Sequence, residues 1–174
     1  AAPHDRLGGA VAASNGVFVA GAARDDDNGT DSGSAYVFDA AGTVTTMAQC
    51  HTNAGSLTHV GGIAVAGQTL TFRMDSAQSG TAWALLAVAT GPVPGWPNCG
   101  VNLGSTGELL IDTPLISVAA PWSGLAADFP VSLPSQSGLV GFPLYLQGVF
   151  IAPTSTPEPL RLTGGLELLL GGYR

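Results

Sequence analysis

Residues 5–38 read DRLGGAVAASNGVFVAGAARDDDNGTDSGSAYVF. Three short apolar runs in this stretch, at 9–13, 16–21 and 34–39, are rich in valine, alanine and aromatic residues. Glycine, asparagine and aspartate separate them, and short apolar runs bounded by such turn residues are typical of β-strands. The stretch therefore predicts a β-segment with an acidic loop between its second and third strands.

The rest of the chain continues this pattern, because 25 glycines and 12 prolines leave no amphipathic run of helical length. The fold class predicted is all-β, with an N-terminal segment at residues 1–42 and a β-sandwich-like domain at 43–174. A hairpin is expected to turn at Gly67-Gln68. The run AWALLAVA lacks polar alternation, which predicts a strand buried on both faces. Further strands are expected at 43–48, 58–66, 68–74, 82–89, 107–111, 115–119, 128–132, 139–152, 159–163 and 166–170.

The order of runs in residues 5–38 resembles a single FG-GAP repeat, the blade unit of integrin-type β-propellers. The resemblance implies a blade-like β-hairpin segment and a family that is extracellular, commonly calcium-dependent and adhesive. It departs from the consensus at Leu7 and Ala23, where the family has phenylalanine and proline. The ending of the chain, at 139–150 and 164–168, is similar to carboxy-terminal β-domains of bacterial secreted proteins.

The acidic loop offers oxygen ligands for a metal ion. Asp25, Asp27, Asn28 and Asp31 place four side-chain oxygen donors within a short segment. Calcium takes six to eight oxygen ligands, and glycines in such a loop allow the backbone to wrap around an ion. The spacing is not that of an EF-hand. A calcium site is expected here; a solvated acidic turn is the alternative.

Charge and composition exclude several classes of function. The formal net charge is −7 and the sequence contains no lysine, which disfavours nucleic acid and anionic membranes as partners. With 45% hydrophobic and 10% charged residues, the chain is too apolar to be a disordered tail. No apolar run reaches the ~18 residues of a membrane span, so membrane insertion is not expected. Residues 1–3, AAP, resemble the remainder of a cleaved signal peptide, and a secreted or cell-surface location is expected.

Two cysteines, Cys50 and Cys99, are the only thiols. An even number in a chain of secreted character predicts a disulfide between them. Two free buried cysteines are the alternative.

No catalytic motif is present, and the chain is predicted not to be an enzyme. The triplets at 74–76 and 111–113 lack the glycine of an aspartic-protease loop, and the histidines show no ligand spacing. Trp96 and Trp122 are expected in loops, where flat rings could form a carbohydrate platform. The alternative is that they plug the ends of the sandwich.

These features together predict a non-enzymatic, secreted structural or adhesive subunit that is stabilised by calcium. Its partner is expected to be a second copy of itself, in an extracellular polymer built by β-strand addition, because unpaired strand edges without lysine invite pairing. A carbohydrate-binding, lectin-like module that recognises extracellular glycans is one alternative. A fragment of a larger cell-surface adhesin is another.

Overall fold

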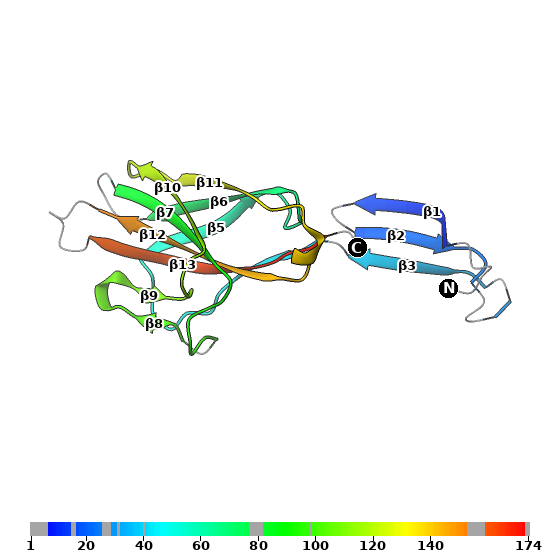
Figure 1. Ribbon diagram of the computed structural model, residues 1–174, viewed down its shortest axis with the longest axis horizontal. Helices are drawn as coiled ribbons and strands as arrows, with labels where there is room; N and C mark the ends of the chain where they lie inside the picture. The colour runs from blue at the N-terminus through cyan, green and yellow to red at the C-terminus, as the bar shows by residue number, and fades with distance from the viewer. Residues whose placement is uncertain are drawn as a thin grey trace.

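The computed structural model confirms an all-β fold (Figure 1). It describes residues 7–14, 17–25, 29–30, 32–39, 41–76, 82–97, 99–152 and 159–172. Two short 3₁₀ helices, η1 (Gly104–Thr106) and η2 (Ser137–Leu139), accompany the strands. The strands are β1 (Leu7–Ser14), β2 (Val17–Ala22), β3 (Ser34–Asp39), β4 (Thr43–Thr46), β5 (Gly55–Gly61), β6 (Thr69–Ser76), β7 (Ala82–Ala89), β8 (Val101–Asn102), β9 (Glu108–Leu109), β10 (Ile116–Trp122), β11 (Ala127–Ser132), β12 (Pro143–Ile151) and β13 (Leu160–Leu169).

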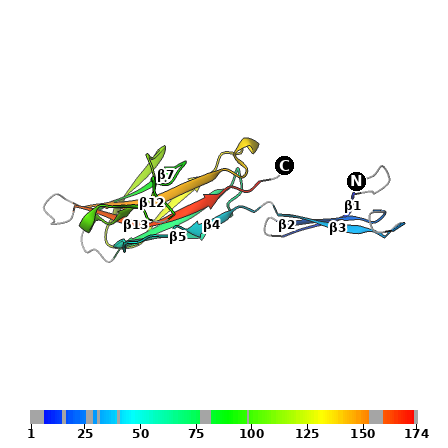
Figure 2. The ribbon, with the colours of Figure 1, turned by 90° about the horizontal axis from the view of Figure 1, so that it is seen from below.

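The N-terminal strands form a sheet of their own, in the order β1-β2-β3. Both pairings are antiparallel, and a register shift between Leu7 and Ala10 accompanies Gly8, whose φ of 91° suits glycine. The three strands expected in this segment are therefore present and form a meander. Figures 1 and 2 show this sheet as a single layer beyond one end of the larger body. Among the described residues, none of its strands pairs with a strand of the larger sheet.

The larger sheet has eight strands and wraps around the main core. Its order is β10-β7-β12-β13-β5-β6-β11, and β4 pairs with β13 beside this path. All its pairings are antiparallel except that of β13 with β5, where Thr163 lies opposite Gly55. Buried side chains from β5, β6, β7, β10, β11, β12 and β13 belong to one apolar cluster, which includes Phe72, Trp122 and Phe150. The sheet therefore nearly closes on itself, with β10 and β11 as its two edges.

Packing across this core is close enough to require a glycine. A Cβ placed on Gly148 of β12 would lie 2.4 Å from the terminal methyl carbon of Met74 in β6. Gly165 of β13 has a comparable role, because a Cβ there would lie 2.7 Å from the sulfur of Met47. These two positions show that glycine permits close approach between strands and does not interrupt them.

A second apolar cluster lies on the outer face of β7 and β12. It contains Ala87 and Ala89 of β7, Tyr145 of β12, and Leu110 and Ile111 from the segment after β9. The segment 91–113, which carries β8 and β9, crosses this face and covers it (Figure 1). The prediction of a strand buried on both faces is confirmed for 84–89, since alternate residues of β7 enter different clusters.

The structure differs from three expected strand boundaries. The expected hairpin is confirmed, because β5 and β6 pair antiparallel. However, β5 ends at Gly61, and the turn at Gly67-Gln68 is part of a longer connection in which Ala64 and Val65 are buried and Val65 pairs with Gly171. The two strands expected at 159–163 and 166–170 form the single strand β13. The strand expected from residue 139 begins at Pro143, after η2.

Candidate functional site

The N-terminal sheet has almost no side-chain cover. All eight residues of β1 are exposed, and Val11 is 66% exposed. Glycine, alanine and serine residues of the sheet and of the turn that follows β2 line a shallow hollow of about 470 Å³. This lining carries no charged or nucleophilic group apart from the Ser34 hydroxyl, so the hollow offers no chemistry for catalysis.

Asp25 fastens the acidic loop to this sheet. Its side chain is only 1% exposed, and Tyr36 of β3 donates a hydrogen bond to its Oδ2. Its backbone carbonyl accepts hydrogen bonds of 3.0 Å from the Ser32 hydroxyl and from the Gly33 N–H. A buried carboxylate bound in this way joins the two ends of the loop.

The other expected calcium ligands, Asp27, Asn28 and Asp31, lie outside the described residues. Within the described part of the chain, no group of three or more acidic, histidine or cysteine side chains is placed to hold a metal ion. The Asp25 carboxylate is chemically suited to calcium.

Residues 1–38 match the FG-GAP repeat. The match covers the N-terminal sheet and the acidic loop, and it supports the resemblance read from residues 5–38. No curated protein and no solved structure matches the chain. No helix in the described ranges has the length and apolar character of a membrane span.

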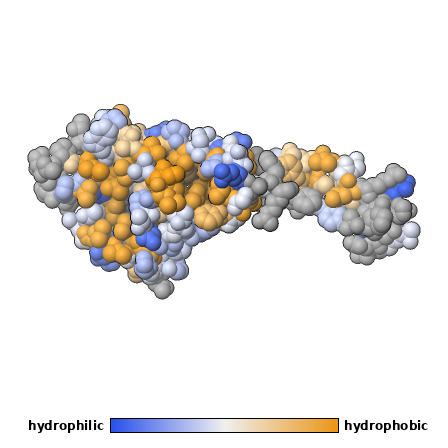
Figure 3. All heavy atoms as spheres, viewed as in Figure 1, coloured by the Kyte–Doolittle hydropathy of each residue, from blue (hydrophilic) through white to orange (hydrophobic). Residues whose placement is uncertain are grey.

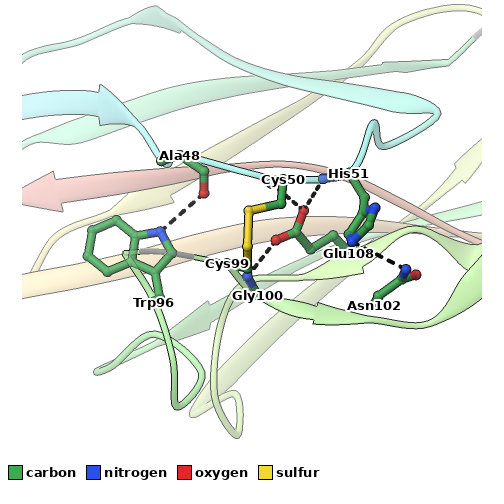
Figure 4. Close-up of a disulfide and its surroundings, with 8 residues drawn as sticks. All are labelled: Ala48, Cys50, His51, Trp96, Cys99, Gly100, Asn102 and Glu108. Atoms are coloured by element: carbon green, nitrogen blue, oxygen red, sulfur yellow. Dashed lines mark hydrogen bonds between the residues drawn. A yellow bond between two sulfur atoms is a disulfide. The ribbon is translucent and has the colours of Figure 1, made fainter.

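The predicted disulfide is present between Cys50 and Cys99 (Figure 4), with a Cα–Cα distance of 5.4 Å. It joins the segment after β4 to the segment that crosses the outer face of the larger sheet. The two cysteines are exposed to solvent, whereas the groups directly beneath them are buried. The disulfide therefore lies between solvent and a cluster of buried polar side chains.

Glu108 is the centre of that cluster (Figure 4). Its carboxylate is fully buried and accepts backbone hydrogen bonds from Cys50 at 2.7 Å, from His51 at 2.6 Å and from Gly100. Burial by itself would raise the pKa of the Glu108 carboxyl. The three N–H donors, with a smaller contribution from the His51 side chain, outweigh burial and hold that pKa below its usual value.

Two further buried side chains, those of Asn53 and Gln147, extend the cluster. The Asn53 amide donates to the carbonyls of Glu108 and Thr163, at 3.0 and 2.7 Å. Gln147 of β12 donates to the same two carbonyls, at 2.8 and 2.9 Å, and accepts from the N–H of Leu110. The cluster thus ties β12, β13 and the crossing segment together through hydrogen bonds. These hydrogen bonds serve to stabilise the fold, and the cluster of Glu108, Asn53 and Gln147 is called the Glu108 clamp.

Sequence reasoning did not identify this clamp. Glu108, Asn53 and Gln147 are far apart in the chain and form no motif. The one available signal was the position of Glu108, a lone acidic residue between Gly107 and the apolar pair Leu109-Leu110. An isolated charge in a strand-sized apolar run is a candidate for a buried, paired group.

The carbohydrate platform is not formed. Trp122 lies in β10, not in a loop, and is 2% exposed, with its ring 4.9 Å from that of Phe150. It therefore has no free face for a sugar ring and fills the core, as the alternative interpretation held. Trp96 is half-buried, donates its indole N–H to the Ala48 carbonyl and meets Tyr145 edge to face. Because Trp122 is buried, the two indole rings do not form a common exposed surface.

Proposed function

We propose that this chain is a non-enzymatic, extracellular structural or adhesive subunit that assembles with copies of itself by β-strand addition. The observation that carries the proposal is β1, an uncharged strand exposed at all eight positions, at the edge of a sheet of three strands. A sheet this small needs an apolar face packed on another layer to be stable. Pairing between copies would bond the free backbone edge of β1 and enlarge this small sheet by further strands.

The extracellular location is supported by two features. The exposed Cys50–Cys99 disulfide is of a kind that persists in oxidising compartments. The FG-GAP repeat at residues 1–38 is of a type found in extracellular, adhesive proteins. Both agree with a subunit that works outside the cell.

Calcium is proposed as the ion that neutralises the acidic loop. Asp25, Asp27, Asn28 and Asp31 would hold it, and the ion would relieve repulsion within a loop that carries four aspartates in seven residues. The hydrogen bonds of the Asp25 carbonyl and carboxylate already fix one end of this loop on β3. Calcium would then order the N-terminal sheet before it pairs.

Electron microscopy of the purified full chain, with calcium and with EGTA, tests the proposal. Filaments or other extended assemblies are expected in calcium, and shorter or fewer assemblies in EGTA. Uniform single particles in both buffers, at every concentration examined, would overturn the proposed function.

A further inference from the structure

The proposed function leaves open which edges meet. The strand orders of the two larger sheets end in β1 and β3 and in β10 and β11; β4, which pairs only with β13, and the two-stranded β8-β9 sheet add shorter edges within the described part of the chain. An unpaired edge presents a row of backbone N–H and C=O groups, and charges or prolines on the strand commonly block it. The four end strands differ in the charges and prolines that they carry.

Two of the edges carry blocking features. β11 contains Pro130, whose nitrogen has no hydrogen to donate and which is tolerated in a sheet where that nitrogen faces the free edge. Asp128 of the same strand is bound to Arg73 at 2.7 Å, so β11 also carries a charged pair. β3 follows the acidic loop directly and ends at Asp39. Pairing along β11 would bring a charged pair and a missing donor to the contact, and the sequence of β3 ends in an acidic residue.

The other two edges carry no charge. β1 reads LGGAVAAS, with no charge and no proline. β10 reads ISVAAPW, so its first five residues, 116–120, are uncharged and precede its single proline. Among the described strands, β1 and β10 are the longest uncharged open edges; β4 (TVTT) is uncharged too but has only four residues.

A second observation marks β10, because its core face is uncovered at one end. Ile116 and Val118 pair with Val88 and Leu86 of β7, which are buried in the main core. Paired residues of antiparallel strands lie on the same face of the sheet. Yet Ile116 is 62% exposed and Val118 is 40% exposed, whereas Trp122 at the other end of β10 is 2% exposed.

This gradient locates a gap in the wrapped sheet. The edges β10 and β11 are close where residues 123–126 connect them, and side chains on the core face become exposed toward Ile116. One added strand along 116–120 would cover Ile116 and Val118. Figure 3 shows apolar side chains at the surface of both the larger body and the N-terminal sheet in this view.

We propose that β1 of one copy pairs with residues 116–120 of β10 in the next copy, which joins the two sheets across the contact. Val11, the most exposed side chain on β1 among the large apolar residues, supplies apolar cover for Ile116 and Val118. The occupant is a second copy of this chain because the chain itself carries the complementary edge: neutral, free of proline and exposed along its full length. β1 and β10 lie toward opposite ends of the molecule (Figure 1).

Two different edges meet in this contact, so it is heterologous. After one contact, the first copy still has a free β10 and the second a free β1, and a head-to-tail contact that does not close produces an open-ended polymer. The inference rests on the proposed self-assembly and assigns its contact surface.

Two lysine substitutions separate the two sides of the contact. Val11→Lys places a charge on β1, and Val118→Lys places one on β10; each is expected to stop growth of the full chain at the monomer, because lysine on an edge strand opposes pairing. Leu125→Lys is the matched control, since Leu125 is 75% exposed in the connection between β10 and β11 and lies on neither edge. Circular dichroism and thermal melting show whether each variant is folded.

Mixing the two variants gives the sharpest result. The Val11→Lys chain keeps an intact β10 and the Val118→Lys chain keeps an intact β1, so an equimolar mixture is expected to form dimers and nothing larger. Sedimentation velocity measures this outcome. Hydrogen exchange provides a readout without substitution: amides in 7–14 and 116–120 should gain protection when the wild-type chain assembles.

The outcomes distinguish this inference from the proposed function. A wild-type chain that remains monomeric overturns both. A wild-type chain that assembles, together with lysine variants that assemble equally well, overturns the β1–β10 pairing and leaves the proposed self-assembly standing. The pairing is also overturned if only one of the two lysine variants fails to assemble. It is likewise overturned if the equimolar mixture of the two variants contains monomers alone.

Discussion

The backbone N–H of Cys50 donates to the Glu108 carboxylate at 2.7 Å, so the disulfide and the buried charge are joined at one residue. On the other side, Gly100, the neighbour of Cys99, donates to the same carboxylate. The disulfide holds together the two backbone segments that solvate Glu108. Its loss would therefore loosen the donors of a carboxylate that has no access to water.

Removal of the disulfide is expected to cost substantial stability. The cysteines are 49 residues apart, and closing a loop of that length lowers the free energy of folding by about 4 kcal/mol on the chain-entropy model. The double variant Cys50→Ser, Cys99→Ser should lose stability of this order in urea unfolding. Wild-type protein in reductant is the control, and the two should unfold at similar urea concentrations. An unchanged midpoint in both would contradict the role assigned to the bond.

Glu108 makes the stability depend on pH. Its pKa is lowered in the folded protein, so its stabilising contribution is present above the usual glutamate pKa and is lost as the pH falls through the lower, folded value. Glu108→Gln removes the charge and its charge-assisted hydrogen bonds, and should cost about 1–3 kcal/mol at pH 7. The measurement is urea unfolding of both proteins at pH 7 and pH 3. The difference between them should shrink at pH 3; a constant difference would refute the assignment.

A side chain at Gly148 is expected to lower stability, because the buried Met74 and Thr163 side chains would have to shift. Gly148→Ala would place a Cβ 2.4 Å from the Met74 methyl carbon, and overpacking of this kind costs about 1–3 kcal/mol. Gly138→Ala is the matched control, because no atom lies within 4 Å of a Cβ at that position. Thermal melting should lower the transition temperature of the first variant only. Equal transition temperatures would mean that the core adjusts more freely than its packing implies.

Calcium is expected to stabilise the N-terminal sheet. Ions that bind only the folded state add about 2.7 kcal/mol at a hundredfold excess over the dissociation constant. The full chain should therefore melt at a higher temperature in calcium than in EGTA, and Asp27→Asn with Asp31→Asn should abolish the difference. Asp112→Asn, an exposed carboxylate of the larger body, controls for the loss of charge. A melting temperature that does not respond to calcium would eliminate the site.

Much of the strand pattern could be read from the sequence, for a local reason. The strands β3 and β7 occupy the predicted ranges 34–39 and 82–89, because turn residues bound both runs. The Cys50–Cys99 bond followed from the presence of only two cysteines. The strand β13 was divided in two because Gly164-Gly165 resembles a turn, whereas Gly165 serves close packing against Met47.

The remaining features depend on contacts between distant residues. Trp122 was expected in a loop because Pro121 precedes it, yet β10 is an edge strand, where proline is tolerated and the next side chain can face the core. The Glu108 clamp is assembled from four separate parts of the chain. Neither the partial exposure of Ile116 nor the neutral edge of β10 can be inferred without the sheet order.

Whether the full chain assembles with copies of itself can be measured from its mass in solution. Sedimentation velocity over a wide range of protein concentration, in calcium, should show species that grow with concentration well beyond the 17.4 kDa of one chain. A single component of 17.4 kDa at every concentration would contradict the account, because the exposed edge of β1 would then be stable without a partner strand.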